Sequence, residues 1–200
     1  MPERRAFTIG HSTHAIDAFV GLLRDAGVRA VADVRRFPGS RRHPQFGRDA
    51  LAAELAGAEI GYAHVEALGG RRSVRPGSPN AGWEVAAFQG YADHMASAEF
   101  GAGLAALEAL ARERPTAVMC AEALWWRCHR RLIADRLVLA GDTVCHILSD
   151  GRTSTHRLPE FASVGPNGQL TYPVPIDVDR VSQTVAREFQ SMLDDGPSSG

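Results

Sequence analysis

The order of hydrophobic and polar positions along the chain predicts short strands that alternate with amphipathic helices. Compact apolar runs at residues 6–10, 28–34, 60–65, 116–120 and 144–148 are typical of buried strands. Between them, apolar residues recur every three or four positions, which predicts helices near residues 16–23, 49–55, 85–97, 103–112 and 128–140. This alternation indicates a single three-layer α/β domain, Rossmann-like or flavodoxin-like, with a mainly parallel sheet flanked by helices.

The chain divides by composition into a domain and a C-terminal part. Residues 1–156 are expected to form the α/β domain, and residues 157–194 an extension that packs on it and contains a helix near residues 181–193. Residues 195–200 are interpreted as a flexible tail or an expression remnant and are left out of the fold prediction. The stretch at 69–82, rich in Gly, Pro and Ser, is interpreted as a long functional loop within the domain.

Composition and charge narrow the class of protein. Apolar residues make up 44% of the chain, enough for a substantial core, and the net charge of −1 gives no overall attraction to nucleic acid or to a membrane. Every basic residue is an arginine, whose planar guanidinium group suits phosphate and carboxylate. The chain has only three cysteines, too few and odd in number for a disulfide framework, and it shows no signal-peptide pattern and no apolar run of membrane length. We therefore expect a cytoplasmic protein with no membrane partner.

Polar residues follow four of the predicted strands at the point where each strand ends. In an open α/β sheet, ligands bind beyond the carboxyl ends of the strands, so we expect these residues to share one site. The catalytic candidates are Cys120, Glu122, Asp33 and His11. The ligand-binding candidates are Gly10, Ser12, Arg35, Ser40, Arg41, Arg42, Cys128, His129 and Arg130.

The first two strand ends allow both a structural and a functional interpretation. Ser12 either caps the following helix or, together with the free amides of that helix, holds an anion. Asp33 either forms a structural ion pair with an arginine such as Arg35 or acts as a catalytic base. The arginines in the loop at residues 35–42 are either solvated or in contact with phosphate or nucleic acid.

The end of the fourth strand carries the most reactive residue types. Cys120 faces a helix expected to begin near Cys128, and the positive end of that helix would lower the pKa of the thiol and make it a nucleophile. Glu122 is then expected to act as an acid or base and to be salt-bridged to Arg130 or Arg35. The alternative is that both cysteines are small buried residues. Seven residues separate the two cysteines, more than in common zinc motifs, so no metal site is assigned.

Five motifs, in this order, resemble those of the DUF488 family of bacterial and archaeal proteins. They are TIGHSTH, VADVRRFPGSRRHPQF, YAHVEALGGRR, GYADHM and MCAEALWWRCHRRLIADRL, and the resemblance covers residues 7–156. It implies a compact α/β domain and brings no settled reaction. The recurring polar positions of the family correspond here to Gly10, His11, Ser12, Asp33, Arg35, Pro38, Ser40, Cys120, Glu122, Cys128, His129 and Arg130.

Our first functional hypothesis is an enzyme that binds a phosphate-bearing or otherwise anionic, nucleotide-like ligand at the strand ends. The reaction would use Cys, Glu and Asp chemistry, and the sequence requires no cofactor. The first alternative is a nucleic-acid-binding module without catalysis, which would use the arginine-rich loop and a stacking tryptophan. The second alternative is a metal-dependent enzyme with Cys120, Cys128, His129 and His11 as ligands.

Overall fold

The protein is built on a six-stranded sheet, which is seen in a computed structural model that describes residues 4–39 and 42–175. The first five strands in spatial order are parallel, and the sixth is antiparallel to its neighbour. This confirms the mainly parallel sheet expected from the sequence. The order across the sheet is β3 (Gly61–His64), β2 (Ala30–Asp33), β4 (Thr116–Cys120), β1 (Arg5–Gly10), β5 (Thr143–Ile147) and β6 (Thr153–Thr155).

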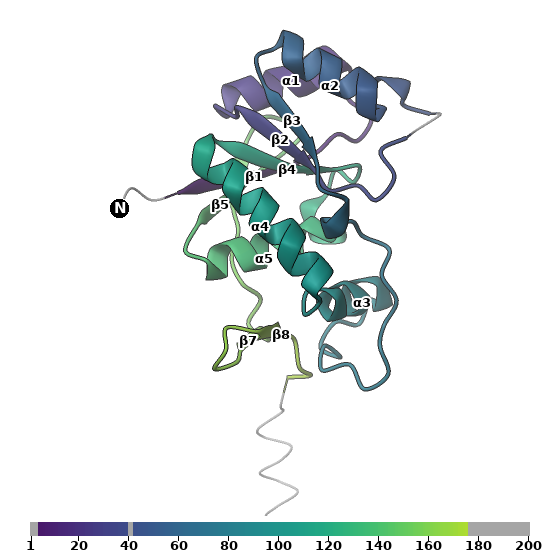
Figure 1. Cartoon of the computed structure of the whole chain (residues 1–200), viewed down its shortest axis with the longest axis vertical. Helices are drawn as coiled ribbons and strands as arrows, with labels where there is room; N and C mark the ends of the chain where they lie inside the picture. Colours follow the sequence, from purple (N-terminus) through teal and green to yellow (C-terminus); the bar gives the residue numbers. More distant parts are fainter. Residues whose placement is uncertain (1–3, 40–41, 176–200) are drawn as a thin grey trace, which may run out of the picture.

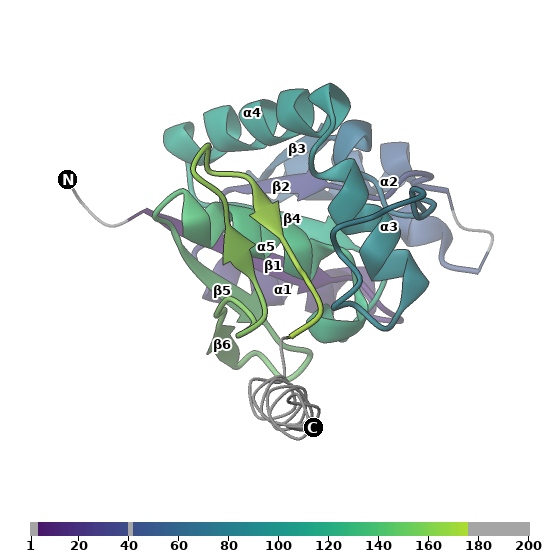
Figure 2. The same ribbon diagram turned by 90° about the horizontal axis from the view of Figure 1, so that it is seen from below.

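Helices cover both faces of the sheet and complete a three-layer α/β domain (Figure 1). One face packs against α1 (Ile16–Asp25) and α2 (Arg48–Gly57). The other packs against α3 (Ala86–His94), α4 (Ala98–Glu113) and α5 (Arg130–Leu139). A view from below shows α4 and α5 running across the sheet (Figure 2).

Alternation along each strand decides which face a side chain serves. In β4, Ala117 and Met119 join the core under α1 and α2, whereas Val118 and Cys120 join the core under α3–α5. Successive residues of a strand point to opposite faces, so each strand contributes to both cores. The same alternation decides to which face of the sheet each polar side chain at a strand end points.

Two helix starts differ from the sequence prediction for reasons visible in the backbone. Helix α4 begins at Ala98, earlier than predicted, because the Ser97 hydroxyl caps it by accepting from the Phe100 amide at 3.1 Å. Helix α5 begins at Arg130, later than predicted, because Trp125–Arg127 forms a separate 3-10 turn.

The capping role predicted for Ser12 is wrong. The residue before α1 is Ala15, and no side chain caps that helix. Ser12 instead lies in the left-handed region with φ of 46°, in the turn that leads from β1 toward α1.

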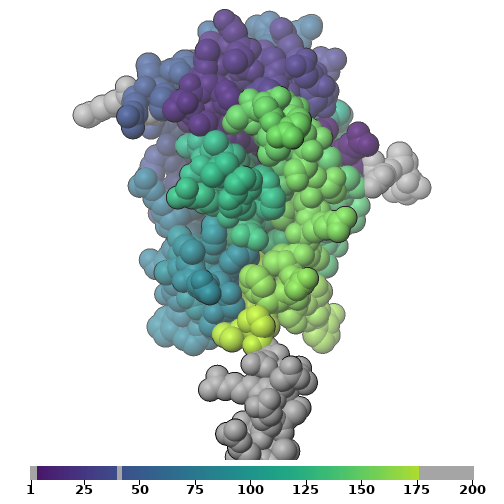
Figure 3. Space-filling view, turned by 180° about the vertical axis from the view of Figure 1, so that it is seen from behind, coloured from purple at the N-terminus to yellow at the C-terminus, as the bar shows by residue number. Residues whose placement is uncertain are grey.

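The C-terminal part contains short strands that were not among the elements predicted from the sequence. After β6, a short hairpin is formed by β7 (Ser163–Val164) and β8 (Leu170–Thr171). The next residue, Tyr172, is buried and pairs with the 80–82 segment, since its carbonyl accepts from the Gly82 amide at 2.9 Å. The Tyr172 amide also donates to Asn80 Oδ1 at 3.0 Å. In the space-filling view, the C-terminal end of the described chain borders the region around α3 (Figure 3). The helix predicted near 181–193 and the tail at 195–200 lie outside the described residues.

Candidate active site

The strand ends meet as the sequence predicts. Parallel pairing places Gly10 opposite Cys120 and Asp33 opposite Met119, so the ends of β1, β4 and β2 are neighbours at one edge of the sheet. Their side chains, however, point to opposite faces. Asp33 lies two residues after Val31 on β2, so its side chain points to the same face of the sheet, toward α1 and α2. The side chain of Cys120 points to the other face, toward α4 and α5. The single predicted site is therefore two clusters that share one edge.

The first cluster is centred on a buried ion pair between Asp33 and Arg35. Arg35 Nη2 lies 2.6 Å from Asp33 Oδ2, and Arg35 Nε lies 2.9 Å from Asp33 Oδ1. The carboxylate also accepts from the Arg35 amide at 3.0 Å and from the Tyr62 hydroxyl at 2.8 Å. Arg35 then donates to the Phe46 carbonyl at 2.8 Å, which ties the loop after β2 to the turn before α2. Of the two interpretations of Asp33, the arrangement matches the structural ion pair.

His11 belongs to the same cluster. Its ring stacks on Phe46 with centroids 4.2 Å apart, and its Nε2 lies 3.3 Å from Arg35 Nη1. Burial, followed by the positive charge of Arg35, lowers the pKa of His11 to about 4. At neutral pH the ring is uncharged, and its Nε2 is occupied as an acceptor of the Arg35 guanidinium.

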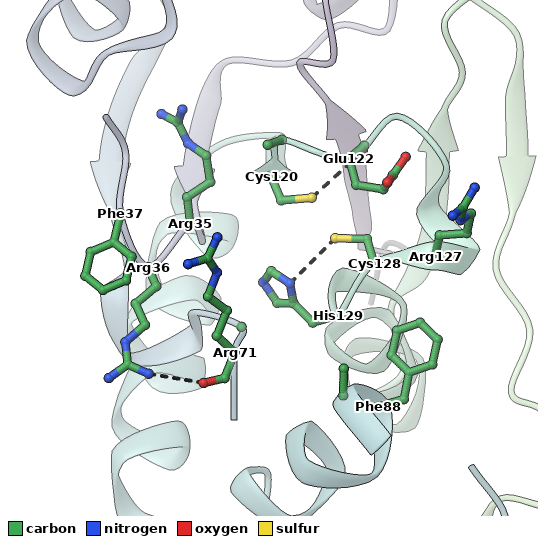
Figure 4. Close-up of a pocket in the computed structure, with 13 residues that line it drawn as sticks. Arg35, Arg36, Phe37, Arg71, Phe88, Cys120, Glu122, Arg127, Cys128 and His129 are labelled. Atoms are coloured by element: carbon green, nitrogen blue, oxygen red, sulfur yellow. Dashed lines mark hydrogen bonds between the residues drawn. The ribbon is translucent and has the colours of Figure 1, made fainter. Parts of the chain in front are cut away.

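The second cluster lines a cavity of about 340 Å³ on the α5 side of the edge, which we call the thiol pocket. Figure 4 shows the sulfur atoms of Cys120 and Cys128 pointing toward one another at its centre, with the His129 ring beside them. Three exposed arginines from different segments surround them. These are Arg36 after β2, Arg71 in the loop after β3, and Arg127 in the turn before α5.

Arg130 controls the charge state of Cys120. Its Nη1 lies 2.8 Å from Cys120 Sγ, and its guanidinium also donates to the Glu122 carbonyl at 2.6 Å and to the Ala123 carbonyl at 2.9 Å. Burial alone would raise the pKa of Cys120, but a hydrogen bond from Cys128 and the charge of Arg130 outweigh burial and lower the pKa to about 7. Cys120 therefore ionises more readily than an ordinary cysteine thiol.

Cys128 and His129 have the opposite character. Burial, reinforced by the adjacent Cys120 thiolate, raises the pKa of Cys128 well above its ordinary value, so this thiol stays protonated. Burial, followed by the Arg130 charge, lowers the pKa of His129 to about 4, against the contrary effect of its hydrogen bond to Val34. His129 Nε2 lies 3.2 Å from the Val34 carbonyl and can reach it only as a donor, which leaves Nδ1 as an acceptor 3.6 Å from Cys128 Sγ.

Two expectations about charged partners need correction. The salt bridge predicted for Glu122 with Arg130 or Arg35 is wrong, because both arginines are engaged elsewhere and the Glu122 carboxylate accepts from the Leu124 amide at 3.1 Å. Arg130 was expected to hold the ligand anion. Arg130 is only 1% exposed, and its guanidinium is bound to Cys120 and two carbonyls, so it contacts the thiol and not the open pocket.

Gly10 has a steric role at this edge. A Cβ atom at Gly10 would collide with the Glu122 carbonyl, because the loop after β4 passes directly over it. Only glycine allows that approach, which places the two carbonyl acceptors of Arg130. The predicted contribution of Gly10 to the site is thus made through the shape of the loop.

The arginine-rich loop contributes residues other than those expected. Arg35 borders the thiol pocket, but its guanidinium is held by Asp33 and points away from it (Figure 4). Arg42 is exposed, and neither it nor Ser12 lines the pocket. Ser40 and Arg41 lie outside the described residues. The pocket residues outside the catalytic and ligand-binding candidates are Arg36, Phe37, Gly70, Arg71, Ala87, Phe88, Ala121 and Arg127.

The tryptophans and the metal hypothesis can be placed as well. Trp125 stacks on His146 with ring centroids 3.9 Å apart, and Trp126 is exposed; neither lines the thiol pocket. Within residues 4–39 and 42–175, no three His, Cys, Asp or Glu side chains come together as metal ligands. The same part of the chain has no helix that is long and apolar enough to cross a membrane.

The fold and this site define a three-layer α/β domain with a thiol pocket at the carboxyl edge of its sheet. Residues 15–137, more than half of the chain, match the family model of DUF488, a domain of unknown function. The chain therefore belongs to the DUF488 family, as its motifs predict. Comparison with curated proteins and with solved structures gives no match.

Proposed function

We propose that the protein is an enzyme that uses Cys120 as a nucleophile on a small anionic ligand bound in the thiol pocket. The ligand class includes phosphate-bearing and nucleotide-like molecules, because arginines and the aromatic rings of Phe37 and Phe88 line the same cavity. A catalytic thiol must be reduced to act, so we place the protein in the reducing cytoplasm.

One observation carries the proposal: Arg130 is a buried cation whose closest ionisable partner is a thiol. A buried charge is costly unless it is paired. Among the described residues, no carboxylate lies within ion-pair distance of Arg130, whereas Cys120 Sγ is 2.8 Å away. A thiolate on Cys120 supplies the missing negative charge, and a structural cysteine would have no need of such a cation.

The surroundings of the pocket favour an anionic ligand. Within the described part of the chain, the exposed Arg36, Arg71 and Arg127 form no ion pair with a carboxylate. Among the described residues that line the cavity, Glu122 is the single acidic one, so the local charge is positive although the whole chain carries −1. A concave surface of one charge sign raises the local concentration of ligands of the opposite sign.

Alkylation with a charged and a neutral reagent tests the proposal. Iodoacetate and iodoacetamide should both modify Cys120 in the folded protein, with a rate that follows an apparent pKa of about 7. The rate should rise about tenfold from pH 6 to pH 8, as the thiolate fraction does. The rate ratio of iodoacetate to iodoacetamide should exceed that of the unfolded chain, because the arginines attract the carboxylate.

Two variants serve as controls in this measurement. Cys120→Ser should lose the fast alkylation, whereas Cys145→Ser, in strand β5, should keep it. The proposal would be refuted if Cys120 reacted only after unfolding. Tight binding of single-stranded nucleic acid with a steep salt dependence, together with an inert thiol, would favour the binding-module alternative.

A further inference from the structure

We propose that Cys128 is a second catalytic thiol, which attacks the sulfur of Cys120 after that residue has reacted, and that the substrate is a small disulfide with anionic arms. This inference rests on the proposed nucleophilic role of Cys120 and names the electrophile as sulfur. It gives the protein a thiol–disulfide exchange activity.

The first support is the position of the two thiols. Both line the thiol pocket, and they lie close enough for each thiol to shift the pKa of the other. Figure 4 shows the two sulfur atoms facing each other, with no other labelled side chain between them. An adduct on Cys120 would therefore form next to a second thiol, which is the arrangement that releases a mixed disulfide by exchange.

The second support is a hydrogen-bond acceptor that positions the second thiol. His129 Nδ1 lies 3.6 Å from Cys128 Sγ and carries a lone pair, because the ring donates its Nε2 proton to the Val34 carbonyl. Gly70 packs against the same ring, where a Cβ atom would come within 2.8 Å of Nδ1. The ring is thus held in an orientation in which Nδ1 accepts the Cys128 S–H and keeps this thiol in place beside Cys120.

The reaction balances in two exchange steps. The Cys120 thiolate attacks one sulfur of the substrate, its S–S bond breaks, and the first thiolate leaves. Cys128 then attacks the Cys120 sulfur, and its proton passes to the second substrate thiolate as that thiolate leaves. The two protein thiols are oxidised by two electrons to a disulfide, and the substrate disulfide is reduced to two thiols. A dithiol reductant returns the protein to its starting state.

The presence of the second thiol favours sulfur over phosphorus as the electrophile. A phosphoryl group on Cys120 would be removed by water, for which a protonated thiol offers no advantage. A mixed disulfide needs another sulfur nucleophile, and Cys128 lies next to Cys120 in the same pocket. The anionic character of the arms follows from Arg36, Arg71 and Arg127 around the cavity.

Three disulfides of similar size test the inference: dithiodiglycolate with two carboxylates, hydroxyethyl disulfide without charge, and cystamine with two ammonium groups. The parent is Cys145→Ser, which leaves only Cys120 and Cys128. With dithiodiglycolate, the parent should become lighter by two hydrogen atoms and release two mercaptoacetates. When Cys128→Ser is added to this parent, the protein should release one mercaptoacetate and keep the other as a mixed disulfide on Cys120. Mass spectrometry of the intact protein would show this adduct. Dithiodiglycolate should react about tenfold or more faster than cystamine.

The outcomes separate the inference from the proposed function. A parent that keeps a stable arm on Cys120 would overturn the role of Cys128 while leaving the nucleophile intact. Failure of all three disulfides, with normal iodoacetate labelling, would overturn the substrate class alone. Failure of both labelling and exchange would overturn the proposed function as well. Cys128→Ala, with the same expected adduct, covers the case in which Cys128→Ser does not fold.

Discussion

Two buried arginines lie at the same edge of the sheet and on opposite faces of it, and they do different things. Arg35 is 7% exposed and is bound by the carboxylate of Asp33 at 2.6 Å. Arg130 is 1% exposed and is bound to the thiol of Cys120 at 2.8 Å. The partner of Arg35 is a carboxylate, whereas the partner of Arg130 is a thiol, which carries a negative charge only when it ionises.

Under the proposed function, this difference gives the two faces different tasks. The Asp33–Arg35 pair holds the loop after β2 in place through the Phe46 carbonyl, and its charges are already satisfied. The Cys120–Arg130 pair leaves the cation dependent on an ionisable sulfur that borders a cavity. A carboxylate partner fixes structure, and a thiol partner makes the sulfur reactive. Three changes test this comparison.

The largest effect is expected on the carboxylate side. Asp33→Asn removes the negative charge and leaves the buried Arg35 without a counterion. Loss of one partner from a buried pair costs about 3–5 kcal/mol in the free energy of unfolding. Urea denaturation, with an unchanged slope against urea concentration, should measure that loss.

A matched control for this change is present in the chain. Asp150 and Arg152 have the same sequence spacing, with the Arg152 amide and Nε donating to the Asp150 carboxylate at 3.0 and 2.7 Å. That pair is exposed, so Asp150→Asn should have little effect on stability. Equal losses in the free energy of unfolding for Asp33→Asn and Asp150→Asn would show that burial does not make the Asp33–Arg35 pair more important for stability.

The second effect concerns the thiol side. Arg130→Met removes the cation next to Cys120, so the pKa of the thiol should rise above neutrality. The rate of alkylation at pH 7 should fall about 10- to 100-fold, which corresponds to about 1.4–2.7 kcal/mol. Arg130→Lys keeps the charge but cannot bond the sulfur and both carbonyls with the same geometry, so it should be intermediate.

The control for Arg130 lies on the same helix. Arg136 is half-buried on α5 and donates to the Gly168 carbonyl at 2.9 Å, away from the thiol pocket. Arg136→Met should leave the pH dependence of alkylation unchanged. An unaltered apparent pKa in Arg130→Met would mean that the positive charge does not activate the sulfur, and the contrast between the two arginines would lose its functional meaning.

The sequence predicts the sheet and its edge well, because both depend on local pattern. The apolar runs place Asp33 and Cys120 at strand ends, and a parallel sheet brings those ends together. The face that each side chain serves depends on register between strands that are far apart in the chain. The pairing of Asp33 with Met119 turns Asp33 and Cys120 to opposite faces, and this is a tertiary property.

The residues around the thiol pocket are harder to predict for a related reason. Arg71 lies at the start of a long loop whose course is set by contacts far along the chain. The Asp93 carboxylate on α3 accepts from the Arg75 amide at 2.8 Å and from the Ser78 hydroxyl at 2.6 Å. The only local signal for Arg71 is that it belongs to the YAHVEALGGRR motif. The geometry that brings it beside Cys120 comes from packing of this loop on α3.

The smallest effect separates attraction of the ligand from activation of the thiol. Arg71→Gln removes an exposed charge at the pocket without touching Arg130 or Cys120. The rate of iodoacetate alkylation should fall about two- to fivefold, since exposed charges contribute about 0.5–1 kcal/mol. The iodoacetamide rate and the apparent pKa should stay as they are, and added salt should reduce the difference. Arg29→Gln makes the same change in charge just before β2, at the amino ends of the strands and away from the thiol pocket, and should alter neither rate. If Arg29→Gln slows iodoacetate as much as Arg71→Gln does, the net charge of the protein draws the anion, and the thiol pocket has no anion-binding role of its own.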